Sequence, residues 1–219
     1  MIGVSSCGVK CSFLMLLCLT ANSVLWGDEP KRRSSTIQGG QALKLVSRWP
    51  EIKQAPRDCL ATVELWIKPD TAAVNRERSF LFNLCNAGGS DLVSVGLALH
   101  RGVLQAHVFG ISLVGTKLAA GKWTHVAFVV DTSTLNKQAR LYVDGKLAAD
   151  ELILQPWPSS FAVAEFFGDR WLNKRIFSGS RGDIRFSNSV RYSKAFSPPA
   201  VLAQDKRTRV LIRGDQLAK

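Results

Sequence analysis

The chain has 219 residues, of which 29 are Lys or Arg and 17 are Asp or Glu, for a formal net charge of +12. The basic residues are scattered along the sequence rather than clustered in a helix or in a nucleic-acid-binding motif, which argues against a dedicated nucleic-acid-binding protein. A solvated basic surface accounts for the charge, and an anionic partner such as an acidic polysaccharide or a membrane surface is the alternative.

The segment 1–27 is typical of a secretory signal peptide. Lys10 precedes an apolar run whose uninterrupted part, Phe13 to Leu19, is far shorter than the roughly 20 residues of a membrane-spanning helix. We therefore expect cleavage after Gly27, or near Ala21-Asn22-Ser23, and export to the periplasm, the cell surface or the medium. Removing 27 of the 219 residues leaves 192, a length that suits one domain.

Residues 28–40 differ in composition from the rest of the mature chain. They include the basic triplet Lys31-Arg32-Arg33 and the pair Gly39-Gly40. Polar, glycine-containing segments of this kind bury little apolar surface and form flexible leads or linkers. We predict a disordered basic lead at 28–40, one folded domain over 41–215 and a short tail at 216–219.

Short apolar runs then follow one another at even spacing, separated by Gly, Asn, Asp and Pro. This cadence predicts an all-β protein built as an antiparallel two-sheet β-sandwich. The expected strands are 41–47, 60–68, 79–85, 92–100, 103–110, 111–118, 123–131, 138–144, 146–154, 161–167, 182–187 and 208–213. Helix has little room, and the best candidate is one turn at Val190 to Ala195.

The strongest local signal lies between Gly121 and Leu147. Val126, Phe128 and Val130 share one face of a strand, and Leu141 and Val143 share a face of the next. Asp144-Gly145 supplies two residues that tolerate positive φ, so a type I′ turn is predicted there. These signals predict a hairpin.

The order of these pieces resembles a known family. Gly121-Lys122-Trp123, then His125-Val126-Ala127, then Leu141 to Lys146 is similar to the centre of the LamG-like jelly roll in the concanavalin A-like lectin and glucanase superfamily. Three further segments extend the likeness over roughly 41 to 215: Thr62 to Pro69, Gly179 to Ser187, and Asn188 to Pro199. The resemblance implies a jelly-roll sandwich with its termini together, so that Gln41 to Ser47 would lie near Thr208 to Arg213.

The resemblance also implies roles for single residues. His125 occupies the Trp-x-His-Val position of the family, which implies a structural histidine hydrogen-bonded between the sheets. Trp66 and Trp123 stand at family positions expected in the core or on a sheet surface. Arg181 departs from the related bacterial members, which have an apolar residue there, so this position is either an exposed edge or differently packed.

Cys59 and Cys85 remain in the mature chain once Cys7, Cys11 and Cys18 leave with the signal peptide. They flank the strands 60–68 and 79–85 and would face each other if those strands paired antiparallel. A disulfide is then one outcome in an oxidising compartment, and two buried free thiols are the other.

Catalysis is disfavoured by the arrangement of acids. Hydrolases of the resembled superfamily carry Glu-x-Asp-x-x-Glu or a close relative on one strand, and no such string occurs here. Asp150 and Glu151 are adjacent, so they would point to opposite faces of a strand. Glu165 with Asp169 is the only other pair of acids that comes near the spacing of the motif. We therefore predict a non-enzymatic protein.

No metal site is predicted from the sequence. His100 and His107 lie on opposite arms of a tight turn without facing each other, and no close-spaced ligand motif is present. Calcium is implied only by the family, which often holds it with loop oxygens, and no cofactor is assigned.

A lectin-like module stacks aromatic rings on sugars beside amide and acid groups. Asp169, Trp171 and Asn173 form the best such stretch, in a loop between strands, and Trp157 in Pro156-Trp157-Pro158 is second. The alternative is that Trp157 and Trp171 cover the edge of the core. Two Arg-Gly-Asp strings, at 181–183 and 213–215, are interpreted as accidental because the first merges into a predicted strand.

These observations predict an exported, non-catalytic LamG-like module that binds a carbohydrate or a cell-surface protein, with an anionic ligand as one option. The alternatives are an exported glycan-processing enzyme with a divergent site and a purely structural accessory domain.

Overall fold

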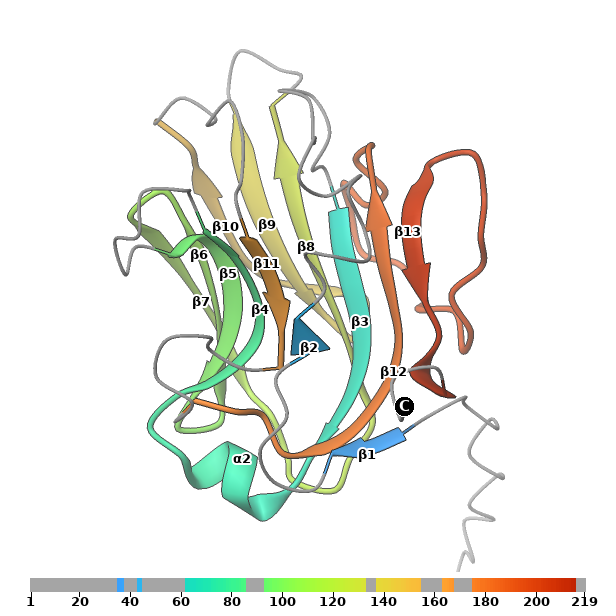
Figure 1. Cartoon of the computed structure of the whole chain (residues 1–219). Helices are drawn as coiled ribbons and strands as arrows, with labels where there is room; N and C mark the ends of the chain where they lie inside the picture. Colours follow the sequence, from blue (N-terminus) through green and yellow to red (C-terminus); the bar gives the residue numbers. More distant parts are fainter. Residues whose placement is uncertain are drawn as a thin grey trace, which may run out of the picture. The chain divides into compact units, whose positions relative to one another are not determined.

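The computed structural model describes residues 35–37, 43–44, 62–85, 93–132, 137–154, 163–167 and 175–215 (Figure 1). They form two antiparallel sheets, as predicted. The seven-stranded sheet A has the order β1 (Ser35–Ile37), β12 (Gly179–Ser187), β3 (Thr62–Pro69), β8 (Thr124–Asp131), β9 (Gln138–Val143), β10 (Lys146–Leu152), and β13 (Thr208–Ile212) also pairs with β12. The six-stranded sheet B has the order β2 (Leu43–Lys44), β11 (Val163–Phe166), β4 (Ser79–Cys85), β5 (Val93–His100), β6 (Val103–Val108), β7 (Ile111–Lys117).

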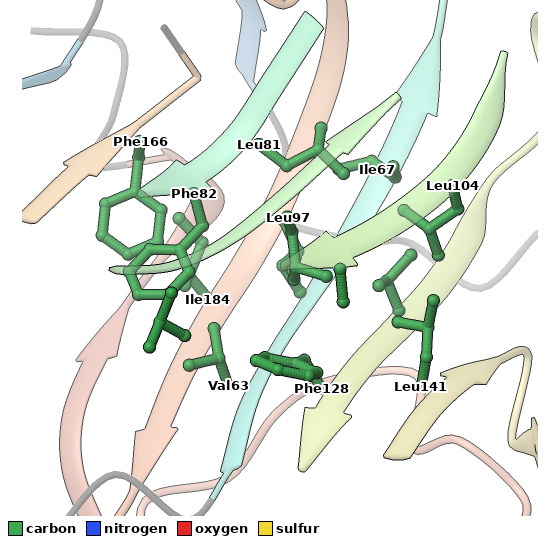
Figure 2. Close-up of a cluster of buried hydrophobic side chains, with 14 of the residues drawn as sticks. Val63, Ile67, Leu81, Phe82, Leu97, Leu104, Phe128, Leu141, Phe166 and Ile184 are labelled. Atoms are coloured by element: carbon green, nitrogen blue, oxygen red, sulfur yellow. The ribbon is translucent and has the colours of Figure 1, made fainter. Parts of the chain in front are cut away.

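The core fills the space between the inner faces of the two sheets (Figure 2). Alternate residues of each strand point inward, so Val63 and Phe128 from sheet A meet Leu97 from sheet B, all of them buried. The Phe82 ring lies 5.1 Å from that of Phe166 and 5.3 Å from that of Phe186 on the opposite sheet. Each large apolar side chain buried in this way contributes about 1.5–3 kcal/mol.

The predicted turn between β9 and β10 is confirmed. Asp144 has φ 48° and Gly145 has φ 76°, so both central residues adopt the left-handed conformation of a type I′ turn. Gly145 is also required by packing, because a Cβ atom there would lie 1.8 Å from the carbonyl oxygen of Phe196. The turn therefore fixes the hairpin and also the path of the chain at Phe196, which is distant in sequence.

The helix prediction is wrong. Residues 190–195 form no helix, and the described helix is α2 (Thr71–Asn75), between β3 and β4. Asp70 caps it, because its side chain accepts a hydrogen bond of 2.8 Å from the backbone N–H of Ala73. Aromatic residues in 190–196 pack on sheet A instead, as described below.

The N-terminal strands differ from the prediction. Ser35–Ile37, expected within a disordered lead, pairs with β12 on the strand edge that β13 also uses. Leu43–Lys44 pairs with β11 in sheet B, whereas β13 lies in sheet A. Leu43–Lys44 and β13 are therefore not neighbouring strands of one sheet, and the nearness expected for 41–47 and 208–213 stays a prediction. The N-terminal strand beside β12 is β1.

The pairing assumed for the cysteines is also wrong. β3 pairs with β8 and β12 in sheet A, whereas β4 pairs with β5 and β11 in sheet B. The strands that flank Cys59 and Cys85 are therefore not neighbours. Cys59 lies outside the described residues, and the disulfide stays a prediction without its original basis.

Candidate functional site

The outer face of sheet A is covered by the chain itself. The segment 188–207 crosses it, and Val190, Tyr192 and Phe196 pack on Ala127, Val129 and Tyr142. The rings of Tyr192 and Phe196 stack at 3.5 Å. The indole Nε1 of Trp66 donates a hydrogen bond of 3.0 Å to the carbonyl oxygen of Pro199, so the predicted sheet-surface position of this Trp is confirmed.

A buried polar network lies beneath this segment, centred on Glu64. Its carboxylate, which has no exposed surface, accepts hydrogen bonds from Arg185 Nε at 2.7 Å, Tyr192 Oη at 2.8 Å and His125 Nε2 at 3.2 Å. Arg185 also donates to the carbonyl oxygen of Ala203 at 2.8 Å. A buried carboxylate is stable only when its oxygens are paired in this way.

The electrostatics of the network follow from its pairing. Burial by itself would raise the pKa of Glu64, but the hydrogen bonds and charges of His125 and Arg185 outweigh it, and the pKa lies below its ordinary value. Burial and the Glu64 carboxylate raise the pKa of Tyr192 above that of a free phenol. Both groups therefore keep the protonation state that their hydrogen bond needs.

His125 is structural, as the resemblance implied, but its bond does not cross between the sheets. Glu64 on β3 and His125 on β8 belong to neighbouring strands of sheet A, and both side chains point to the outer face of that sheet. The His125 ring also packs edge-on against Trp66 at 5.0 Å and Phe196 at 5.8 Å. The network is inaccessible to solvent, so it holds the fold rather than a ligand.

The two Arg-Gly-Asp strings are bonded to each other. Arg213 Nη1 donates to Asp183 Oδ2 at 2.9 Å, and the backbone N–H of Gly214 donates to Asp183 Oδ1 at 3.1 Å. Asp183 and Arg181 are each only 5% exposed. Arg181 is thus a buried residue with different packing: its guanidinium lies 5.1 Å from the ring centroid of Phe167, and burial lowers its pKa to about 10.

The outer face of sheet B has a different character. Its register aligns Asn83, Gly96, His107 and Ser112 in one row, and Phe80, Ala98, Gln105 and Val114 in the next. Phe80, Asn83 and Ala98 are buried, whereas Gln105 and His107 are half-buried and Ser112 is exposed. Among the described residues of these two rows, the polar side chains that reach solvent therefore lie on β6 and β7.

His107 has unused hydrogen-bonding capacity. Its Nδ1 lies 2.9 Å from the hydroxyl of Ser112, while its Nε2 is buried and has no hydrogen-bond partner. Burial lowers the pKa of His107, and the positive charges of Arg78 and His100 lower it further. The imidazole is thus neutral near pH 7, and its Nε2 lies beneath the surface of this face.

Two arginines lie at the β4 side of this face. The guanidinium carbon of Arg175 lies 5.7 Å from the Phe80 ring centroid, and that of Arg78 lies 5.9 Å from it. The backbone N–H of Phe80 donates to the carbonyl oxygen of Arg175 at 2.9 Å, which holds this segment beside β4. We call Arg78 and Arg175 the arginine pair.

The residues predicted to bind a ligand, Asp169, Trp171, Asn173 and Trp157, all lie outside the described residues. The sequence analysis missed Gln105, Ser112 and Arg78 as site residues, and it read His107 only as a metal-ligand candidate. The sequence did indicate that His107 and Gln105 share one face of a strand, because they are two residues apart and the residue between them, Ala106, is apolar. No signal in the sequence placed β7 beside them.

Metal binding finds no support in the described part of the chain, where no group of three or more His, Cys, Asp and Glu side chains is placed to hold an ion. The calcium implied by the family stays a prediction. Within the same residues, no helix has the length and apolarity to cross a bilayer.

Comparison with solved structures finds the same fold in carbohydrate-binding proteins. The CBM40 of the Ruminococcus gnavus IT-sialidase, bound to α2,3-sialyllactose, has a TM-score of 0.58 and 16% identity, with 74% of this chain and 92% of that chain covered. A proposed carbohydrate-binding protein from Bacteroides ovatus has a TM-score of 0.59 and 15% identity, with 84% of this chain and 52% of that chain covered.

A leech intramolecular trans-sialidase has a TM-score of 0.56 and 20% identity, with 76% of this chain and 26% of that chain covered. The search of curated protein sequences found no significant match. The sequence profile of the concanavalin A-like lectin/glucanases superfamily matches residues 53–195, well over half of the chain. Together with the two-sheet antiparallel architecture, this match shows that the chain belongs to the concanavalin A-like lectin and glucanase superfamily.

Proposed function

We propose that this chain is an exported, non-catalytic carbohydrate-binding module whose ligand lies on the outer face of sheet B. One observation carries the proposal: the outer face of sheet A is covered by the segment 188–207, whereas sheet B presents Gln105, His107 and Ser112 toward solvent. Ser112 is exposed there, and its hydroxyl lies 2.9 Å from Nδ1 of His107, so these two side chains form one polar group on that face.

The chemistry of these side chains suits sugar hydroxyls. A hydroxyl group both donates and accepts hydrogen bonds, and the Gln105 amide and the Ser112 hydroxyl also offer both functions. Their positions are fixed by the strand register rather than by a flexible loop, so little ordering entropy opposes binding. The sialyllactose bound by a structural relative supports a sugar ligand for this fold.

Binding is favoured over hydrolysis at this face. Glycoside hydrolysis uses two carboxylates on either side of the scissile bond. The sequences of β4, β5, β6 and β7 contain no Asp and no Glu, and the other described strands of sheet B contribute a single acid, Glu165 on β11. A ligand held there would meet hydrogen-bonding and basic groups without an acid from β4 to β7 to protonate a leaving group.

The test is a glycan array probed with the exported protein, with and without calcium. Gln105→Ala should weaken binding to the best glycan about threefold to tenfold, as the loss of one hydrogen bond does. Gln204→Ala is the matched control, because this Gln is exposed in the segment that covers sheet A. It should leave binding unchanged.

Three results would overturn the proposal. A protein that binds no glycan in either condition would point to a structural accessory domain. Binding that is insensitive to Gln105→Ala would move the site off this face, and turnover of a bound glycan would restore the enzyme alternative. Export is tested separately by N-terminal sequencing of the exported protein, which should begin at Asp28.

A further inference from the structure

We infer that the sheet B site recognises an anionic group on its sugar, a carboxylate or a sulfate, through the arginine pair. This inference rests on the proposed function and deepens it by naming the class of ligand. It follows from the placement of Arg78 and Arg175 beside the hydrogen-bonding row of β6 and β7.

The arginine pair is held in place before any ligand arrives. Both guanidinium groups lie within 6 Å of the buried Phe80 ring, at 5.7 Å and 5.9 Å. Both arginines are half-buried, so their stems are packed while part of each residue reaches solvent. A guanidinium fixed in this way loses less entropy when it binds a carboxylate or sulfate, and it can bind with two parallel hydrogen bonds.

Acidic side chains are missing from β4 and from the strands on one side of it, β5 to β7, whereas β11 on its other side carries Glu165 in register with Asn83. The sequence from Leu92 to Val130 contains no Asp or Glu, although it contains His100, Arg101, His107 and Lys117. Arg78 forms no ion pair within the described part of the chain, where the ion pairs involve residues of sheet A and its adjoining segments. The adjacent acid in sequence, Glu77, is exposed and does not bridge to Arg78. An anionic group on the sugar would give Arg78 the ion pair that it lacks among the described residues.

The two parts of the site lie close enough to act on one ligand. The row that holds His107 lies beside the row that holds Phe80 on one face of sheet B, because Asn83 pairs with Gly96 and Gly96 pairs with His107. In the register, the buried Ala98 lies between Phe80 on β4 and Gln105 on β6. An acidic sugar can therefore place its anionic group on the arginine pair and its hydroxyls toward Gln105.

The experiment compares three ligands with one common core: lactose, 3′-sialyllactose with a carboxylate and 3′-sulfolactose with a sulfate. Isothermal titration calorimetry on the full exported chain at physiological salt should show at least tenfold tighter binding of one charged ligand than of lactose. The two charged ligands distinguish a carboxylate from a sulfate. Arg78→Gln should reduce that preference about tenfold, the effect of losing a charge-assisted hydrogen bond.

Two further variants control the result. Lys206→Gln removes one charge from an exposed position at the start of the β13 turn and should leave the preference unchanged. Arg78→Lys keeps a charge and much of the stem over Phe80, so it should retain part of the preference even if Arg78→Gln folds poorly.

The outcomes separate the two proposals. Equal binding of lactose and both charged ligands would overturn this inference and leave the carbohydrate-binding function standing. A charge preference that survives Arg78→Gln, or that Lys206→Gln removes equally, would also overturn it. Failure to bind any of the three, with neutral glycans bound on the array, would overturn the inference alone, whereas an empty array would overturn both.

Discussion

The hydroxyl of Tyr192 donates a hydrogen bond of 2.8 Å to Oε2 of Glu64, a residue 128 positions earlier in the chain. This bond joins the segment that covers sheet A to the centre of the sheet itself. Because Glu64 also binds Arg185 and His125, one buried carboxylate connects β3, β8, β12 and the covering segment. The covering segment is therefore an integral part of the folded domain.

Glu64→Gln should lower the free energy of unfolding by about 3 kcal/mol, because it leaves the buried guanidinium of Arg185 without its charged partner. Urea denaturation followed by tryptophan fluorescence measures the change. Glu151→Gln on β10 is the control, since this Glu is exposed, and it should change stability by less than about 0.5 kcal/mol. Equal stability of the two variants would contradict a structural role for the network.

The same carboxylate predicts an acid dependence. The pKa of Glu64 in the folded state is below its ordinary value of 4.5, so the unfolded chain binds the proton first as the pH falls. Its contribution is therefore present above about pH 4.5 and is lost as the pH falls through the lower folded-state pKa. The slope of stability against pH in this acid range should be smaller in Glu64→Gln than in the wild type.

The tyrosines predict the behaviour at high pH. The chain has 2 Tyr residues, and burial raises the pKa of both Tyr142 and Tyr192 above 10.0. The native protein should therefore show less phenolate absorbance at pH 10 than the unfolded chain, which is about half ionised there. Tyr192→Phe should leave one titrating group and a smaller loss of stability as the pH rises above 10, because Tyr192 stabilises the fold only while it is protonated. A native titration midpoint at or below 10 would contradict this assignment.

Local signals were sufficient for most of the fold. The alternation around Phe128 predicted β8, and Asp144-Gly145 predicted the turn that the positive φ angles confirm. These signals are local because side-chain direction repeats every two residues and a type I′ turn needs specific residues at two positions. The superfamily resemblance rested on the same segments.

Contacts between distant segments could not be predicted in this way. The covering segment contains Tyr192 and Phe196 at a spacing that fits a helical turn, but these residues pack on sheet A, which no local pattern specifies. The assumed pairing of the strands before Cys85 failed for the same reason, since a connection of this length can join two strands of one sheet or cross to the other. The exposed row of β6 and β7 depends on the register between strands, which the sequence did not provide.

Gly145→Ala should destabilise the domain by about 2–4 kcal/mol, more than the loss of one turn residue explains. The φ of 76° disfavours any side chain, and the added Cβ would lie 1.8 Å from the Phe196 carbonyl oxygen, so the covering segment must shift. Gly121→Ala is the control, because Gly121 also has a positive φ of 73° but nothing within 4 Å of its Cβ position. Equal melting temperatures would show that the segment can move without cost.

The Arg-Gly-Asp strings should not mediate adhesion. Asp183→Asn should lower the free energy of unfolding by about 2 kcal/mol, because Asp183 accepts hydrogen bonds from Arg213 and Gly214. Asp215→Asn changes the exposed Asp of the second string and should alter neither stability nor cell attachment to the immobilised protein. Attachment that a soluble Arg-Gly-Asp peptide inhibits, and that Asp215→Asn abolishes, would restore an adhesive role.

The remaining prediction concerns Trp171, which the sequence placed in a ligand-binding loop and which lies outside the described residues. It precedes Arg175, a member of the arginine pair, by four positions. If its ring stacks on the sugar that the pair binds, Trp171→Ala should weaken glycan binding about threefold to tenfold, since such ring contacts contribute about 0.5–1.5 kcal/mol. The melting temperature should stay within about 2 °C of the wild type, because a ring that contacts the ligand contributes little to the core. Leu154→Ala, at an 86% exposed position, is the control for loss of an exposed apolar side chain. A stability loss of about 3 kcal/mol or more with unchanged binding would instead assign Trp171 to the core, and the ligand site would then rest on the sheet B face alone.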